Sequence, residues 1–459
     1  MRRVFLIIFG TIISLNSIAQ IEGTLSLMTN IPQSIDLNPA VTPKYRYVIG
    51  VPVISSFGGM FSSNGLSYNN IFTKEADGND VSTPKILKKS ANVNYFQLSA
   101  QTDILRFGMR INPDIYITFS SSIKGFARFK MEKETIASFE KGLSYFLDDK
   151  TVFFSKLDGL SFIDTNVGIA IQLSDQFSFG GRIKFLQGLH NITSRKSSFQ
   201  VVENNGLDLT YSADVSVLTS GLDSNSNGSY SMNSEIGKLL FKNVGVGIDI
   251  GISFKPNDKL VLGASIVDFG FINWKNNPKE LYIDSQKITF LGTKLTDLFG
   301  KSETPSFLGG FNSANKDKFK LKEREGSSYN TMLPIKAYFS GKYEIQKNLN
   351  LAGLIFVEQF RSRISTGLTL GVTKDFGKWL SSSLTYTVAN KSYVNLGLGV
   401  SFNLTPIQIY FVGDNLLLNS AFLKSSKLVN FRFGINVAWG GELKRSKKPT
   451  NQRRPSGIR

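Results

Sequence analysis

The sequence predicts an all-β protein, a transmembrane antiparallel β-barrel of about 14 to 16 strands. Three observations support this fold class. Many segments alternate apolar with polar or small side chains, as half-buried strands do. The turns between several of these segments are short whereas other connections are long, which is the asymmetry of outer-membrane barrels. The chain also begins with an export signal.

Residues 1–20 have the composition of a secretory signal peptide. Arg2 and Arg3 precede an apolar run from Val4 to Leu15, and small residues follow at Ser17-Ile18-Ala19. A basic start, an apolar core and a small-residue cleavage site predict export and removal of this segment. The 459-residue chain contains no cysteine, so neither a lipidated cysteine nor a disulfide is expected.

Residues 21–42 show no alternation and precede the first strand, which we expect near Tyr45. A barrel of this size is too wide for its own side chains to fill, so this segment is a candidate plug of the lumen. The alternative is a periplasmic strap that closes the first and last strands without entering the lumen.

Residues 43–439 are predicted to form the barrel. Val244 to Phe254 places apolar side chains at even positions, and Val429 to Trp439 places them at odd positions. The opposite faces are largely Gly, Ser, Asn and Thr, which predicts a lumen poor in charged and aromatic side chains. The apolar faces suit lipid, where a charge near the midplane costs about 2 to 4 kcal/mol. We expect the last strand to pair with the first, with Arg432 facing inward or toward the rim.

Aromatic residues near the predicted strand ends suit an interfacial belt, in which an amphipathic ring lies between lipid and water. The residues assigned to this belt are Trp274, Trp379, Trp439, Tyr282, Tyr338 and Tyr393. For Trp274 the alternative is a ligand-stacking role.

The sequence predicts no enzyme activity. His190 is the only histidine, there is no cysteine, and no Gly-x-Ser-x-Gly elbow is present. A metal site would need further nitrogen or sulfur ligands, so no metal or cofactor is predicted and His190 is expected at the rim.

The formal net charge of +18 is concentrated toward the end of the chain. Residues 440–459 contain two prolines and seven basic residues, a composition typical of disorder. The basic residues are Lys444, Arg445, Lys447, Lys448, Arg453, Arg454 and Arg459. If the last strand ends in the periplasm, this tail lies there and could bind an acidic envelope protein or peptidoglycan. The alternative is a solvated extension without a partner. No nucleic acid partner is predicted.

Several motifs resemble known barrels. Asn38-Pro39-Ala40 is similar to a motif in the N-terminal region of FadL-like barrels. Five longer blocks resemble a Bacteroidota family of uncharacterised outer-membrane barrels. These blocks are residues 181–188, 268–274, 377–380, 390–393 and 410–415. The resemblance implies a distant similarity to FadL-type transporters of hydrophobic compounds and to the type 9 secretion barrel, and no agreed activity.

Two functions are compatible with a barrel in the outer membrane of a Gram-negative bacterium. The first is a non-enzymatic accessory or scaffold subunit of an envelope complex for secretion or outer-membrane assembly, suggested by the basic tail, the long loops and the uncharged lumen. The alternative is a FadL-like channel for uptake of hydrophobic small molecules. The channel requires an apolar pocket behind the N-terminal segment, and a lumen lined solely by Gly, Ser, Asn and Thr would contradict it.

Overall fold

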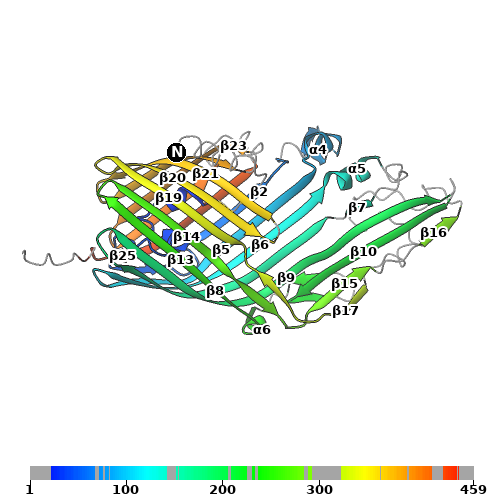
Figure 1. Ribbon diagram of the computed structural model, residues 1–459, viewed down its shortest axis with the longest axis horizontal. Coiled ribbons are helices and arrows are strands. Elements are labelled where there is room, and N and C mark those ends of the chain that lie inside the picture. Colours follow the sequence, from blue (N-terminus) through cyan, green and yellow to red (C-terminus); the bar gives the residue numbers. More distant parts are fainter. Residues whose placement is uncertain are drawn as a thin grey trace, which may run out of the picture.

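The computed structural model describes residues 22–67, 72–75, 78–81, 83–141, 151–153, 155–204, 208–224, 230–232, 236–283, 288–291, 322–361, 363–389, 392–415, 427–441 and 443. The predicted signal peptide and the basic residues of the predicted tail lie outside these ranges. The described residues form a closed antiparallel barrel of 14 strands (Figure 1). The prediction of an all-β barrel with 14 to 16 strands is therefore confirmed.

The first strand of the wall has two parts, β1 (Tyr47–Gly50) and β2 (Phe57–Ser63). The others follow in chain order: β5 (Val93–Asn112), β6 (Ile115–Glu132), β8 (Lys156–Gln172), β9 (Phe177–Asn204), β13 (Asn243–Asn257), β14 (Leu260–Trp274), β19 (Ile335–Gln346), β20 (Leu349–Phe360), β21 (Arg363–Phe376), β22 (Leu380–Ala389), β23 (Ser392–Leu404), β24 (Ile407–Asp414) and β25 (Leu428–Trp439). A short strand, β18 (Tyr329–Met332), extends the row of β19 alongside β14.

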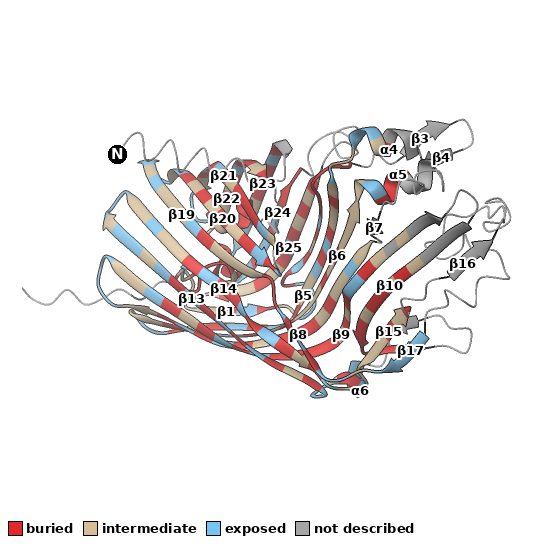
Figure 2. Cartoon of the chain, turned by 45° about the vertical axis from the view of Figure 1, so that its right-hand side comes forward, coloured by how far each residue is buried: buried red, intermediate tan, exposed pale blue. Residues whose placement is uncertain are grey.

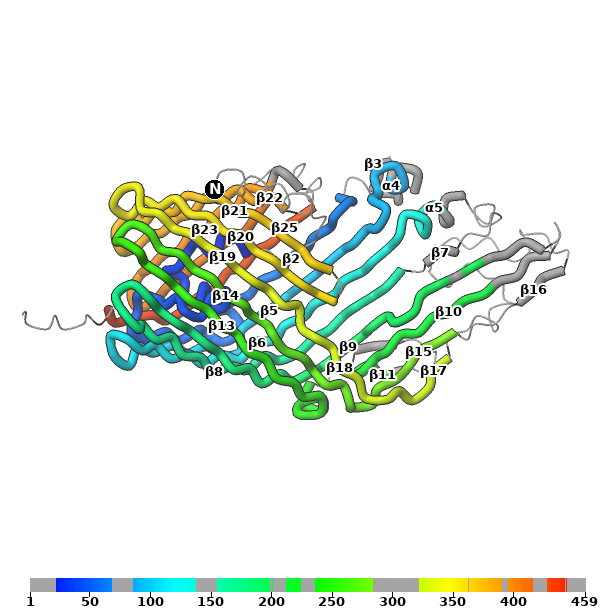
Figure 3. The backbone as a smooth tube through the Cα atoms, in the orientation of Figure 1, coloured from blue at the N-terminus to red at the C-terminus, as the bar shows by residue number. Residues whose placement is uncertain are grey.

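The barrel closes where the last strand meets the first, as predicted. β25 pairs with β1, with Trp439 opposite Tyr47, and then with β2, with Phe433 opposite Phe57. Figure 3 shows the blue start of the chain beside its red end. Between β1 and β2 the wall bulges, because residues 51–56 lie opposite only Gly434 and Ile435.

Each wall strand has an apolar outer face and a buried inner face (Figure 2). In β13, Val246 and Ile248 are exposed on the outside, whereas Asp249 is buried on the inside. Arg432 likewise faces inward from β25 and is buried. The exposed apolar band of the outer face is suited to lipid.

The belt assignment is wrong for Trp274 and Tyr338, which are both buried inside the barrel. Asp268 and its neighbour Val267 lie opposite Asp249 in a bulge of β14, and Asp268 has a φ of 61°. One extra residue in a strand moves all later side chains to the other face. Trp274 therefore faces the lumen, whereas Trp379 is exposed and Trp439 stacks on Tyr47 with ring centroids 5.2 Å apart.

A sheet projects from the barrel at the end opposite the short turns (Figure 1). The second half of β9 pairs with β10 (Asp208–Ser220), β10 pairs with β15 (Lys279–Ile283) and β16 (Ile288–Leu291), and β15 pairs with β17 (Lys322–Glu325). The remaining elements at this end are β3 (Phe72–Glu75), β4 (Gly78–Val81), α4 (Thr83–Lys89), α5 (Lys133–Lys141), β7 (Thr151–Phe153), β11 (Leu222–Ser224), β12 (Tyr230–Met232) and α6 (Ile236–Leu239). Among the described residues, no helix is both long and apolar enough to cross a membrane.

Candidate functional site

The N-terminal segment lies inside the lumen rather than across its mouth. It contains α2 (Gly23–Leu27) and the 3-10 helix η1 (Pro32–Asp36), and most of its side chains are buried. We call residues 22–42 the plug segment. A five-residue helix is not stable alone, so contacts with the wall must hold α2 in shape.

One face of the plug segment is apolar and packs on the half of the wall formed by β19 to β24. α2 contacts each of these strands. Leu25, Met28 and Ile31 belong to one buried cluster with Phe356 and Tyr410. Burial of such side chains contributes about 1.5 to 3 kcal/mol each.

A polar contact on this side joins α2 to a buried carboxylate. The Thr24 hydroxyl donates a hydrogen bond to Oδ1 of Asp414 at 2.6 Å, and Asn430 donates to Oδ2 at 2.7 Å. Gly397 and Gly399 lie beneath α2, where an added Cβ would overlap Thr24 and the Met28 sulfur. The absence of side chains at these two glycines therefore allows α2 to approach the wall.

The other face of the plug segment carries Asp36, which accepts hydrogen bonds from three arginines. Arg106 of β5 donates through both terminal nitrogens, at 3.1 and 2.8 Å, and Arg182 of β9 and Arg432 of β25 each donate at 2.9 Å. Burial alone would raise the pKa of Asp36, but the three guanidinium groups outweigh burial and hold this pKa well below its usual range. Asp36 therefore remains charged and anchors the segment.

Asn38, Pro39 and Ala40 form a turn against the wall. Oδ1 of Asn38 accepts the Ala40 backbone N–H at 2.9 Å, and Nδ2 of Asn38 donates to the Ile252 carbonyl at 3.1 Å. At Gly180 an added Cβ would overlap the Pro39 carbonyl, and at Gly251 it would overlap the Asn38 side chain. The Asn38-Pro39-Ala40 turn thus packs against one glycine of β9 and one of β13, where the wall has no side chain.

The prediction of a lumen poor in charged and aromatic side chains is wrong. Ion pairs within 4.0 Å join six cations and six anions into one connected network. The cations are Arg106, Lys124, Arg182, Lys184, Lys336 and Arg432, and the anions are Glu22, Asp36, Asp103, Asp164, Asp249 and Asp268. Tyr338, Tyr410 and Trp274 add buried rings. Each strand contributes only one or two charged residues to this network, and small residues surround them in the sequence. The alternation along a single strand therefore does not reveal how many charges meet in the lumen.

Asp268 joins three lysines of this network because of the bulge in β14. Its carboxylate lies 2.5 Å from Nζ of Lys184, 3.1 Å from Nζ of Lys336 and 3.9 Å from Nζ of Lys124. Its backbone N–H donates to Oδ1 of Asp249 at 2.7 Å. Aspartate tolerates a positive φ better than most residues, so the bulge can position this carboxylate.

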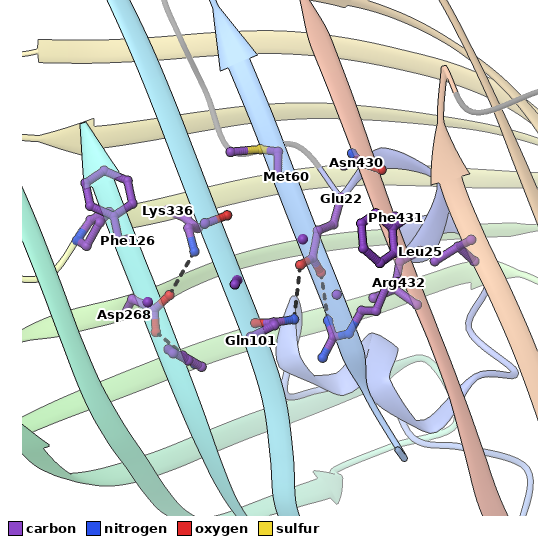
Figure 4. Close-up of a pocket in the computed structure, with 18 of the residues that line it drawn as sticks. Glu22, Leu25, Met60, Gln101, Phe126, Asp268, Lys336, Asn430, Phe431 and Arg432 are labelled. Carbon is purple, nitrogen blue, oxygen red and sulfur yellow. Dashed lines mark hydrogen bonds and ion pairs between the residues drawn. The ribbon is translucent and has the colours of Figure 1, made fainter. Parts of the chain in front are cut away.

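An open cavity lies over the plug segment, and the space between its lining atoms, open solvent included, is about 790 Å³. Figure 4 shows Glu22 and Arg432 facing each other at this cavity, with Lys336 near Asp268. The apolar lining residues are Leu25, Met60, Ala100, Phe126, Phe162, Leu333, Pro334, Val412 and Phe431. The charged lining residues are Glu22, Lys124, Asp268, Lys336, Asp414 and Arg432. The lining therefore combines apolar and charged residues, and it does not consist solely of small polar residues.

His190 does not line this cavity. Nδ1 of His190 lies 2.9 Å from the Ser161 hydroxyl, and neither residue lines the cavity. Within the described residues, no cluster of three or more His, Asp or Glu side chains could hold a metal ion. Residues 444–459, which include every basic residue of the predicted tail, lie outside the described ranges.

Comparison with known proteins gives a family match and several structural likenesses. A family described as a family of unknown function, DUF5723, matches residues 39–414. No curated protein sequence matches the chain.

Three similar solved structures illustrate the structural likenesses. A Pseudomonas aeruginosa FadL homologue has 10% identity and a TM-score of 0.47 over 93% of this chain and 100% of that chain. The Ralstonia pickettii toluene transporter TbuX has 9% identity and a TM-score of 0.42 over 89% and 94% of the two chains. The Pseudomonas putida toluene transporter TodX has 10% identity and a TM-score of 0.39 over 91% and 92%.

Proposed function

Because the chain belongs to the family of unknown function DUF5723, its activity must be inferred from its own geometry, and we propose an outer-membrane channel for uptake of hydrophobic small molecules. The observation that carries this proposal is the cavity over the plug segment. Leu25, Phe126, Phe162 and Leu333 line it, inside a barrel whose outer face suits lipid. Concave sites with mostly apolar walls and a few polar groups are typical of small-molecule binding.

Filling the cavity tests this function. Ser99 faces the lumen from β5 and lines the cavity, whereas Leu98 of the same strand is exposed on the outer face and does not line the cavity. We expect Ser99→Trp to lower uptake of a radiolabelled hydrophobic compound by about tenfold in a Gram-negative host that expresses the full chain. Leu98→Trp is the matched control and should leave uptake near the level of the unmodified protein. Uptake that Ser99→Trp leaves unchanged, at equal surface expression, would contradict the channel.

We also propose that Asn38, Pro39 and Ala40 act as the plug anchor. The contacts of this turn with Gly180 and Gly251 support the assignment. Gly180→Ala should displace the turn and cost about 1 to 3 kcal/mol by overpacking. The neighbouring Gly181→Ala is the control, because its added Cβ would meet only ordinary contacts at 3.8 and 3.9 Å. Equal protease sensitivity of the plug segment in the two variants would argue against the anchor.

An accessory subunit of an envelope complex is the second candidate function. The sheet of β9, β10, β15 and β17 supports it, since this sheet projects beyond the barrel and offers a surface to another protein (Figure 1). We propose that the basic residues from Lys444 to Arg459 bind an acidic envelope partner or peptidoglycan in the periplasm. Truncation after residue 441 should then abolish co-purification from native membranes in mild detergent. Recovery of the full chain only as an isolated monomer would count against this role.

A further inference from the structure

We infer that the cavity selects ligands whose polar end is an uncharged hydrogen-bond donor, such as an alcohol or a primary amide, and discriminates against those that carry a carboxylate. This inference rests on the proposed channel function and names its substrate class. It follows from how the charged residues around the cavity are already paired.

Each cation that lines the cavity already contacts a carboxylate. Arg432 donates to Glu22 at 2.8 Å and to Asp36 at 2.9 Å. Nζ of Lys336 lies 3.1 Å from Asp268. Nζ of Lys124 lies 2.6 Å from Asp164. An incoming anion would have to displace a protein carboxylate rather than meet a free cation.

The whole network is electrically balanced, with six cations and six anions in contact. A carboxylate that entered the cavity would add a seventh anion to a buried site. Removing an anion from water is expensive unless new partners compensate it, and here the partners are already engaged.

Asp414 adds to this discrimination. It lines the cavity, and its carboxylate accepts hydrogen bonds from Thr24 and Asn430. Among the described residues, no lysine or arginine forms an ion pair with it. Whether charged or protonated, Asp414 supplies no positive charge to an anionic ligand.

An uncharged polar end meets no such cost. A hydroxyl or amide can donate to the carboxylates of Glu22 or Asp268 without changing the charge balance, while its apolar body contacts Phe126, Phe162 and Leu333. Hydrogen bonds to charged acceptors are the stronger ones, so the paired carboxylates still favour such a ligand.

Equilibrium dialysis of radiolabelled decan-1-ol and decanoate at pH 8, against the full protein in lipid nanodiscs with empty nanodiscs as the blank, tests this inference. We expect decanol to bind at least about tenfold more tightly than decanoate. Equal affinity or a preference for decanoate would overturn the inference while leaving the channel standing. Binding of neither probe would overturn the channel itself, and the inference with it.

Two variants shift the charge balance in opposite directions. Glu22→Gln removes an anion beside Arg432, so decanoate should bind about tenfold more tightly, whereas decanol keeps Asp268 as an acceptor and should change in affinity by less than about threefold. Lys336→Met removes a cation and should weaken decanoate binding by a larger factor than decanol binding. Glu344→Gln, at the short-turn end of β19 and outside the cavity, is the matched control. If neither Glu22→Gln nor Lys336→Met moves decanoate affinity, charge pairing does not set the selectivity.

Discussion

The two halves of the barrel wall hold the same plug segment by different forces. On the side of β5, β9 and β25, buried arginines contact Asp36 through charge-assisted hydrogen bonds. On the side of β19 to β24, α2 is held by apolar packing, by small wall residues and by hydrogen bonds of the Thr24 hydroxyl with Asp414 and Thr385. The charged half therefore specifies where the segment lies, since its bonds need defined geometry, and the apolar half adds the burial of Leu25, Met28 and Ile31.

Mutation of the charged half should lower the free energy of unfolding more than mutation of the apolar half. Asp36→Ala removes the shared acceptor of Arg106, Arg182 and Arg432. Removing one partner of a buried ion pair costs about 3 to 5 kcal/mol, and we expect about 3 kcal/mol because each arginine keeps a second carboxylate. Denaturant unfolding in detergent and protease sensitivity of the plug segment measure the effect.

Asp258→Ala is the control for this change. Asp258 lies in a short turn with a fully exposed side chain, so its loss should change stability by less than about 0.5 kcal/mol. A plug segment that remains as protected in Asp36→Ala as in Asp258→Ala would show that the arginines do not anchor it.

Loss of the hydrogen bond from Thr24 to Asp414 in the apolar half should lower the free energy of unfolding by less. Thr24→Val keeps the shape of the side chain but leaves the Asp414 carboxylate with one donor fewer, which costs about 1 to 3 kcal/mol. Ser26→Ala is the matched control, since the Ser26 hydroxyl bonds only to the Gly23 carbonyl within α2. A larger loss of unfolding free energy for Thr24→Val than for Asp36→Ala would reverse the comparison.

Of the changes considered, mild acid should have the smallest effect on how firmly the plug segment is held. The pKa of Asp36 is lowered by its arginines, so the stabilisation is fully present above the ordinary aspartate value of about 3.9 and is lost only as the pH falls below it. Labelling of a cysteine introduced into the plug segment, divided at each pH by its labelling in the denatured chain, should therefore be the same at pH 7 and pH 5. A normalised labelling that is higher at pH 5 than at pH 7 would mean that another group controls the anchor.

Much of the wall was predictable because the alternation of apolar and polar residues in a half-buried strand shows which face of the strand is apolar. The alternation in Val244 to Phe254 predicts which side chains face lipid, and the last strand closes on the first as expected. Asn38-Pro39-Ala40 also marked a segment that does not belong to the wall. These are local properties, since each depends on residues adjacent in the chain.

The candidate site was less predictable, because its chemistry is shared among distant strands. Asp36, Arg182 and Arg432 are isolated charges in the sequence, and only barrel closure brings their side chains together. The bulge at Asp268 reverses the facing of Trp274, which alternation alone assigns to the lipid side.

The sequence by itself therefore determined a barrel whose strands have two different faces, and the tertiary structure decided what fills its lumen. The physical reason is the range of the interactions. Strand periodicity acts between next neighbours, whereas the twelve-residue ion network and the cavity beside it depend on side chains that meet across the barrel.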